Sequence, residues 1–215
     1  MKNLIFIAPP AAGKGTISEL LKEKYALPHI STGDLLRQAI LDNNPYKEEI
    51  ETIQKQGLLV KDEIVLDLLK QRIECKDCEN GYILDGFPRN IEQAESYEEL
   101  LKDIHKDLGI VILLEVDKNL AKARITGRLS CPGCGAIYNE AFDNMKPTIE
   151  GICDKCSAKL TKRSDDNEKT FLQRFDTYLE KTEPLINYYE EKGLLYRIDS
   201  TDALKAVEEI EKIMK

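Results

Sequence analysis

The chain has 215 residues and a formal net charge of −8, a length that favours one main domain with room for inserted segments. The acidic balance argues against nucleic acid as a partner, so any anion site has to gather its cations locally. No apolar run approaches bilayer length, and the run at residues 4–8 is too short for a signal peptide, so we expect a soluble, cytoplasmic protein without a membrane partner.

The first predicted element is a strand over residues 4–7 that leads into a loop of small residues and then a helix. Residues 8–16 read Ala-Pro-Pro-Ala-Ala-Gly-Lys-Gly-Thr. Backbone N–H groups of such a loop face one anion, the lysine reaches the outer phosphates, and the threonine hydroxyl can bind Mg²⁺. A plain turn is the alternative, and the flanking strand and helix disfavour it. The predicted phosphate-binding residues are Ala11, Ala12, Gly13, Lys14, Gly15 and Thr16.

Alternation of apolar runs and helical patterns continues along the chain and predicts an α/β fold with a five-stranded parallel sheet. The other four predicted strands are residues 28–30, 82–84, 110–114 and 194–198. Two excursions interrupt the alternation, and both should emerge beyond the carboxyl ends of the strands, where they can cover one cleft. The predicted division is a P-loop core of residues 1–30, 62–128 and 163–215, a helical insertion of residues 31–61, and a cysteine-bearing insertion of residues 129–162. We expect Asp62 to cap the helix that follows the first insertion.

The third predicted strand ends in an acid, Asp85, which is followed by Gly-Phe-Pro and Arg89. An acid directly after a buried strand is where P-loop proteins hold Mg²⁺ or its waters. A guanidinium just past a proline-stiffened turn can bind a phosphate with two hydrogen bonds. The turn alone would be ordinary, but together with the phosphate loop it predicts a metal-side carboxylate and a phosphate ligand.

Four further arginines follow the fourth strand. Arg124 and Arg128 are four residues apart, which predicts two guanidiniums on one helical face, an arrangement that costs stability unless an anion joins them. Arg163 and Arg174 flank the start of a later helix, for which Asp165 or Asp166 is the expected cap. A solvated charged face explains any single arginine in a chain with 33% charged residues, but it explains the whole set poorly.

Four cysteines lie in the second insertion with the spacing C-x₂-C-x₁₈-C-x₂-C, and they are Cys131, Cys134, Cys153 and Cys156. This spacing is typical of a structural four-thiolate Zn²⁺ site, which has no open position for catalysis. Disulfides are the alternative, and the expected compartment disfavours them. Cys75 and Cys78 have no second pair and are predicted to be free thiols.

Together these motifs resemble the adenylate kinase family, in its bacterial long-lid, zinc-bearing form. The resemblance covers essentially the whole chain and rests on Gly13 to Thr16, Ser31 to Arg37, Asp85 to Arg89, Arg124 to Arg128, and Arg163 with Asp165, Asp166 and Arg174. It implies the reaction of Mg-ATP with AMP to give two ADP, in a monomer with a core, an AMP-binding insertion and a lid.

The resemblance also implies roles for individual residues. The implied catalytic residues are Lys14, Asp85, Arg89, Arg128, Arg163 and Arg174. Besides the phosphate loop, the implied ATP side contains Arg124, Arg128, Ile137, Tyr138 and Asp202. The implied AMP side contains Thr32, Arg37, Leu58, Leu59, Val60, Gly86, Phe87, Pro88, Arg89, Gln93, Arg163 and Arg174. From the sequence alone, Gln93 reads more simply as an exposed polar residue on a helix.

Such a site needs neither histidine nor a catalytic acid, because the attacking phosphate of AMP is largely a dianion at neutral pH. Cations suffice to stabilise the transition state, and a closing lid excludes water as the competing acceptor. Three positions depart from the family pattern, since Ala8, Ala11 and Ser200 stand where glycine is usual. If Ala8 or Ala11 needs a positive φ, the methyl group costs roughly 1–2 kcal/mol, which we expect to weaken ATP binding.

Two other function classes remain open at this point. A kinase for UMP, CMP or GMP shares the phosphate loop and the Asp85 turn, but Thr32, Gln93 and the long cysteine-bearing lid disfavour it. A nucleotide-dependent zinc-ribbon adaptor without catalytic activity needs fewer cations than this chain provides.

Overall fold

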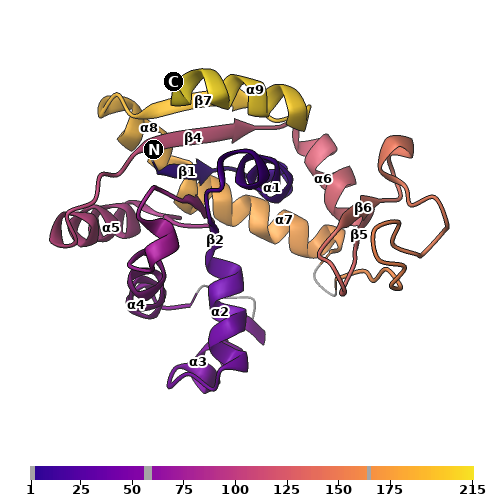
Figure 1. Cartoon of the computed structure of the whole chain (residues 1–215), viewed down its shortest axis with the longest axis horizontal. Helices are drawn as coiled ribbons and strands as arrows, with labels where there is room; N and C mark the ends of the chain where they lie inside the picture. The colour runs from indigo at the N-terminus through magenta and orange to yellow at the C-terminus, as the bar shows by residue number, and fades with distance from the viewer. Residues whose placement is uncertain (1–2, 56–59, 164–165) are drawn as a thin grey trace.

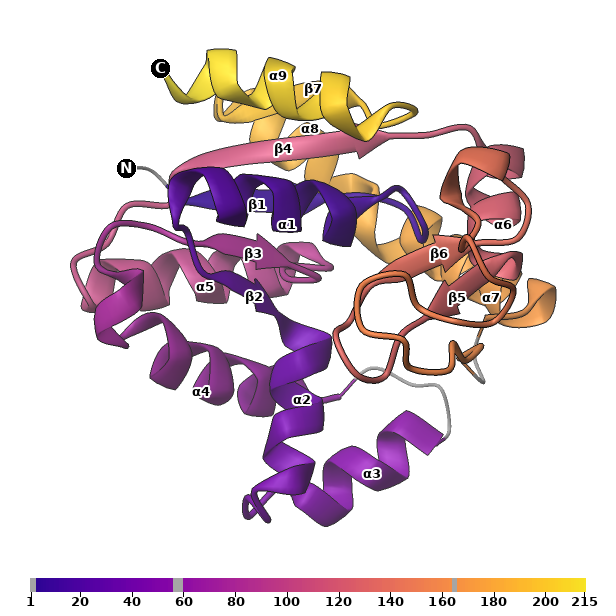
Figure 2. The same ribbon diagram turned by 45° about the vertical axis from the view of Figure 1, so that its right-hand side comes forward.

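The computed structural model describes residues 3–55, 60–163 and 166–215. Its main sheet has five parallel strands in the order β2-β3-β1-β4-β7 (Figures 1 and 2). These strands are β1 Leu4–Ile7, β2 His29–Ser31, β3 Ile83–Asp85, β4 Ile110–Glu115 and β7 Leu195–Asp199. All five predicted strands are confirmed, each to within one residue at either end.

The helices of the described residues connect these strands and form the helical insertion. They are α1 Lys14–Tyr25, α2 Thr32–Leu41, α3 Lys47–Lys55, α4 Asp62–Ile73, α5 Ile91–Asp103, α6 Lys118–Thr126, α7 Glu168–Thr177, α8 Pro184–Glu191 and α9 Ala203–Met214. Short 3₁₀ helices lie at Lys76–Cys78 and Asp143–Met145, and a π-helix lies at Tyr178–Thr182. None of the described helices is long and apolar enough to span a bilayer.

The sheet is buried on both faces, which explains why its strands read as continuous apolar runs. Alternate residues of β1 enter different clusters: Leu4 and Phe6 pack with α1 and α9, whereas Ile5 and Ile7 pack with α4, α5 and α8. Figure 2 shows the two helical layers in front of the sheet and behind it. The molecule therefore has three layers, and only the ends of the strands are left for a ligand site.

Two segments project from the carboxyl end of the sheet. Helix α2 begins directly after β2, and α3 follows α2 (Figure 1). After β4 and α6, the chain forms a two-stranded antiparallel hairpin of β5 Arg128–Ser130 and β6 Ile137–Asn139. The hairpin has a small core of its own, built by Cys131, Tyr138, Cys153 and Leu160.

The structure corrects three local predictions about helix ends. Asp62 is the first residue of α4 and not its cap, since Lys61 holds the cap position without a side-chain hydrogen bond. Helix α6 ends at Thr126, so Arg128 lies on β5 and does not share a helical face with Arg124. Asp166 does not cap α7, because the side chain of Asn167 holds the cap position and accepts the Thr170 amide; Asp165 lies outside the described residues.

Gly109, just before β4, offers a test of how tightly the sheet is packed. Its φ is +91°, and a Cβ added there would lie 2.2 Å from the carbonyl oxygen of Asn3. We expect Gly109→Ala to lower the free energy of unfolding by about 2–5 kcal/mol, because backbone strain and overpacking add.

Gly193→Ala is the matched control, with a φ of +66° and no atom within 4 Å of the added Cβ, so only the strain remains. We expect it to cost about 1–2 kcal/mol. Urea titration of both variants measures the difference, and equal losses would contradict the close approach at Asn3.

Candidate active site

The phosphate loop lies between β1 and α1, at the middle of the sheet. Ala11 and Gly13 have positive φ values of 61° and 89°, and Gly13 is the cap residue of α1. The Lys14 ammonium folds back over the loop, 3.4 Å from the carbonyl oxygens of both Ala8 and Pro9. Gly15 and Thr16 are exposed on the first turn of α1. The loop thus places a helix N-terminus, a lysine and a threonine next to one another in the chain.

Asp85 ends β3 directly beside β1, where it pairs in register with Phe6. Its carboxylate lies among cations: burial raises the pKa of Asp85, but His29, Lys14 and Arg89 together lower it below the ordinary value. Burial also lowers the pKa of Lys14, and the charge of Asp85 opposes that effect. Asp85 is therefore an ionised carboxylate next to the phosphate loop.

His29 is a neighbour of Asp85 that the sequence did not reveal. Its Nε2 atom lies 3.6 Å from Oδ2 of Asp85, and its Nδ1 atom lies 3.6 Å from Oε1 of Glu19. Burial lowers the pKa of His29, but the two carboxylates raise it more, so the net direction is upward. The only available signal was its place on a strand that ends at the same sheet edge, and the pairing of β2 with β3 does not follow from chain order.

The turn after β3 brings Thr32, Gly86 and Arg89 together. The Thr32 hydroxyl donates to the Gly86 carbonyl over 3.1 Å, and Nε of Arg89 donates to the same oxygen over 2.7 Å. Gly86 has a φ of +84°, and a Cβ there would lie 2.9 Å from the Thr32 hydroxyl oxygen. The surrounding protein lowers the pKa of Arg89, Asp85 opposes this, and the charge of Arg174 adds to it. The charge of Arg174 on α7 therefore acts on Arg89.

Gln93 is buried, so its interpretation as an exposed polar residue is wrong. Its Oε1 accepts the Arg89 amide over 2.7 Å, and its Nε2 donates to Oδ1 of Asp62 over 2.5 Å. Gln93 thereby fixes the backbone at Arg89 to the start of α4. Phe87, Pro88 and Val60 are buried nearby, whereas Leu58 and Leu59 lie outside the described residues.

Two predicted arginines are not shown in contact with this group. Arg37 pairs with Asp34 on its own helix, and its side chain is 57% exposed. Arg163 is exposed on the segment that returns from the hairpin to α7. The described electrostatic interactions link Lys14, Asp85 and Arg89, and the charge of Arg174 acts on Arg89; Arg37 and Arg163 are not among them.

Arg124 lies beside the phosphate loop, and Arg128 lies at the base of the hairpin. Nη2 of Arg124 donates to the carbonyls of Ser200 and Thr201 over 3.0 and 2.8 Å. Its Nη1 is buried with no hydrogen-bond partner and would lie 3.8 Å from a Cβ added at Gly13. Arg128 forms two hydrogen bonds with Asp166, whose side chain is fully buried. The sequence suggested Asp166 only as a helix cap, because its partner lies 38 residues away.

The adjoining 199–202 turn is held without help from glycine. The Ser200 hydroxyl donates to the Glu115 carbonyl over 2.7 Å, and Asp202 caps α9 by accepting the amides of Leu204 and Lys205. The Asp202 carboxylate is thus engaged by its own helix.

The four hairpin cysteines form one cluster in which all Sγ atoms lie within 4.8 Å of one another. Tetrahedral Zn–S bonds of about 2.3 Å place sulfurs roughly 3.8 Å apart, so the cluster matches a four-thiolate site. Burial raises the pKa of Cys153, but the Tyr138 hydroxyl and the amides of Cys156 and Lys155 lower it to about 6. None of the six cysteines forms a disulfide. The prediction for Cys75 and Cys78 as free thiols is confirmed, and burial raises the pKa of Cys78 to about 11.

Tyr138 and Ile137 lie on β6 with different surroundings. The Tyr138 ring is buried in the hairpin, and its hydroxyl contacts Sγ of Cys153 at 3.5 Å and accepts the Asp154 amide over 2.8 Å. Ile137 is 39% exposed. Only the backbone of Tyr138 remains for a ligand, while Ile137 can offer its side chain as well.

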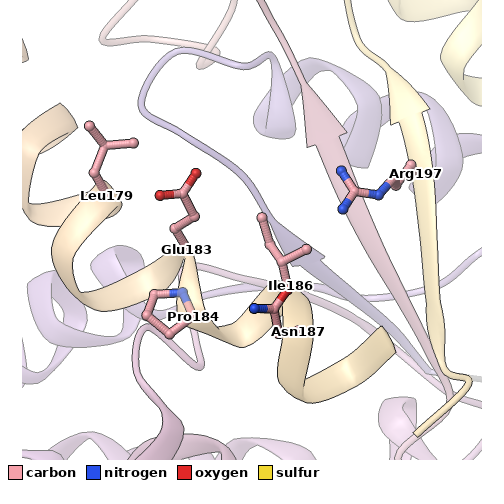
Figure 3. Close-up of a pocket in the computed structure, with 6 residues that line it drawn as sticks. All are labelled: Leu179, Glu183, Pro184, Ile186, Asn187 and Arg197. Atoms are coloured by element: carbon pink, nitrogen blue, oxygen red, sulfur yellow. The ribbon is translucent and has the colours of Figure 1, made fainter. Parts of the chain in front are cut away.

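A separate cavity of about 480 Å³ lies at the β7 edge of the sheet (Figure 3). Its lining comprises Leu179, Glu183, Pro184, Ile186, Asn187 and Arg197. Arg197 is held there by Glu115 and Glu190, each over 2.8 Å, so its charge is already neutralised. None of the predicted site residues lines this cavity.

A phosphate loop on the central strand, an ionised carboxylate on the next strand and arginines from several elements define a P-loop phosphotransferase. The pattern of the adenylate kinase family matches residues 6–194. The chain belongs to the adenylate kinase family.

Full-length relatives support this assignment. The chain is 43% identical to an adenylate kinase of Archaeoglobus fulgidus over 214 residues, which cover 99% of this chain and 98% of the relative. It is also 43% identical to an adenylate kinase of Thermotoga petrophila over 216 residues, which cover 100% and 97%. An adenylate kinase of Clostridium botulinum is 42% identical over 205 residues, which cover 95% and 94%. The protein is thus an ATP:AMP phosphotransferase that converts ATP and AMP to two ADP, and the adaptor and the kinases for other monophosphates are rejected.

Ala11 is the position in the phosphate loop where a glycine should be better tolerated. Its φ of 61° strains an L-residue in the folded protein. Removing the methyl group should therefore raise the free energy of unfolding. We expect Ala11→Gly to raise the free energy of unfolding by about 0.5–1 kcal/mol, after subtracting the greater freedom of glycine in the unfolded chain.

Ala8→Gly is the control, because Ala8 does not have a positive φ and should only lose stability. Thermal unfolding of the two variants and their KM values for ATP check the expectation. A large gain in ATP affinity for Ala11→Gly without a gain in stability would show that the strain acts on binding instead.

Proposed function

We propose that this adenylate kinase transfers the phosphoryl group by positioning and charge stabilisation alone. The observation that supports the proposal is a linked set of charges: Lys14 and Arg89 both interact with the Asp85 carboxylate, and the charge of Arg174 acts on Arg89. These cations come from α1, the β3 turn and α7, so no local sequence pattern requires them to meet. A common anion with spread negative charge is the ligand that explains their meeting.

On the ATP side, the phosphate loop binds the outer phosphates through backbone N–H groups, Lys14 and Thr16. Arg124 adds a buried Nη1 without a protein partner, which is aimed at the side of Gly13 and is available to the nucleotide. Arg128 changes partner from Asp166 to phosphate when the lid moves in. The backbone at Ile137, Tyr138 and Asp202 completes the adenosine contacts.

On the AMP side, Arg89 and Arg37 bind the monophosphate, with Thr32 and the Gly86 to Pro88 turn beside it. Gln93 orients Arg89 through its backbone amide, and exchanges its bond to Asp62 for one to the adenine edge. Val60 packs against the base, and Leu58 and Leu59 belong to the same proposed contact. Arg163 and Arg174 bear on the transferring group from the lid side.

No general base is required in this scheme, because the acceptor phosphate is already largely a dianion. Asp85 therefore serves as a fixed negative charge that orders Lys14 and Arg89 and offers oxygens to the metal side of ATP. Mg²⁺ bound with ATP neutralises charge on the phosphates. Thr16 and Asp85 are the residues that would hold it, and their oxygen donors suit this cation.

We further propose three moving parts: the core of residues 1–30, 62–128 and 163–215, the AMP-binding insertion of residues 31–61, and the lid of residues 129–162. The lid's own small core and its separate hairpin support this division. Zn²⁺ held by Cys131, Cys134, Cys153 and Cys156 braces the lid, whose closure excludes water from the phosphoryl group. The protein acts as a monomer on ATP, AMP and ADP, without nucleic acid or membrane.

The base specificity and the arginine roles can be tested together in a coupled assay of ADP formation from ATP. We expect turnover with AMP and none above background with UMP, CMP or GMP. Replacing Arg174 with alanine should lower kcat about 10³-fold, because a cation that stabilises the transition state is lost.

Arg197→Ala is the control, since Arg197 lies at the β7 edge and pairs with Glu115 and Glu190. Its kcat should stay within about twofold of the wild type. A comparable loss in both variants would mean that Arg174 acts through stability and not through the reacting phosphates.

The proposed zinc site predicts that Cys156→Ser loses bound metal and lowers Tm by about 5–10 °C, since metal binding is linked to lid folding. Chelation of the wild type should give the same shift. Cys75→Ser is the matched control, because Cys75 is an exposed free thiol outside the cluster. Metal content by atomic emission and calorimetric unfolding measure both effects, and a full metal content in Cys156→Ser would refute the four-thiolate assignment.

A further inference from the structure

Asn139, the last residue of β6, is a buried polar residue at the junction between the hairpin and the core. Only 3% of its surface is exposed. Its Nδ2 donates to the carbonyl of Arg124 over 2.7 Å, and its Oδ1 accepts the amide of Ala141 over 2.9 Å. Both ends of the side-chain amide are therefore engaged, one with α6 and one with the hairpin.

The same residue also holds Arg128. Arg128 and Asn139 are partners in the β5–β6 ladder, and the Glu140 amide donates to the Gly127 carbonyl over 2.8 Å. A Cβ added at Gly127 would lie 2.4 Å from Oδ1 of Asn139, so the amide packs directly on the α6–β5 connection. Figure 2 shows β6 beside α6 at this point. The Asn139 side chain thus contacts the backbone of Arg124 and the α6–β5 connection at Gly127, while the backbone of Asn139 is the ladder partner of Arg128.

We propose that Asn139 is a positioning residue that sets where Arg124 and Arg128 stand relative to the phosphate loop. The inference rests on the proposed function, which assigns both arginines to ATP. Asn139 touches neither guanidinium. It acts by fixing the carbonyl of Arg124 at the end of α6 and the strand position of Arg128, from which each side chain extends.

The backbone positions of Arg124 and Arg128 matter because both side chains extend to partners on other elements. Arg124 spans from α6 to the 199–202 turn, and its Nη1 is aimed at the side of Gly13. Arg128 reaches Asp166 across the base of the hairpin. If the α6–β5 connection shifts, the guanidiniums of Arg124 and Arg128 are displaced together. Their present hydrogen-bond partners belong to other elements and do not move with the connection, so the bond geometry is lost.

The test compares Asn139→Asp and Asn139→Ala with the wild type. Asparagine to aspartate keeps the volume and the acceptor for Ala141, but it replaces the donor to the Arg124 carbonyl with a carboxylate oxygen and adds a buried charge, whereas the alanine variant removes both bonds without a charge. We expect both variants to raise KM for ATP about tenfold, the scale of one lost buried hydrogen bond, with KM for AMP within twofold. Asn119→Ala is the matched control, because Asn119 is exposed on α6, and it should leave both KM values unchanged.

The split between the two substrates separates positioning from a merely structural role. A structural role lowers Tm and the active fraction, and therefore kcat, while both KM values stay at the wild-type level; that result would overturn the inference. Assays are run at a temperature at which circular dichroism shows each variant folded, and Asn139→Asp serves if the alanine variant is not.

Two further variants separate this inference from the proposed function itself. Arg124→Ala and Arg128→Ala should each raise KM for ATP. If they do and the Asn139 variants do not, the positioning role of Asn139 is wrong while the arginine assignment stands. If neither arginine variant raises it, the ATP-side assignment fails first. In the double variant Asn139→Asp with Arg124→Ala, the Arg124→Ala change should raise KM for ATP by a smaller factor than it does in the wild-type background.

Discussion

The proposed site depends on the attraction between the negative charge of Asp85 and the positive charges of Lys14 and Arg89. Lys14 and Arg89 carry like charges that repel at close range, and a carboxylate beside them reduces that cost. The carboxylate is there because β3 pairs directly with β1, in register from Leu4 to Phe6. Sheet pairing therefore fixes the distance between the phosphate loop and its counter-charge before any nucleotide arrives.

Three buried polar side chains hold the elements around this charge cluster. Gln93 ties Arg89 to the start of α4, and Asn139 ties the end of α6 to the hairpin. Asp166 similarly holds Arg128 at the base of the hairpin. A buried amide or carboxylate is costly unless it is satisfied, so each of these residues restricts the backbone to one arrangement. Arg89 and Arg124 are thus held through their backbones, and Arg128 is held through its guanidinium.

Local sequence patterns predicted the strands correctly, because a strand is marked by several apolar residues in a row. They did not predict the hydrogen-bond partners of single polar residues. The five strands follow from continuous apolar runs, which sheets covered on both faces require. Asp62, Asp166 and Gln93 were misread because acids and amides at helix starts usually bind the nearest amides or water. In the structure, Asp62 and Gln93 bind each other across 31 positions of the chain, and Asp166 binds Arg128 across 38 positions. No local sequence pattern indicates these distant partners.

The sequence by itself determined the P-loop class, the parallel sheet, the spacing of the cysteines and the family resemblance, since each rests on short motifs or apolar runs that can be recognised one at a time. Only the tertiary structure decided that His29 neighbours Asp85, that Arg124 and Arg128 lie on different elements, and that Asn139 joins them. The physical reason is that strand order and the end of a helix depend on packing between distant segments. The residues that determine this packing are distant from one another in the chain, so no short stretch of sequence reveals it.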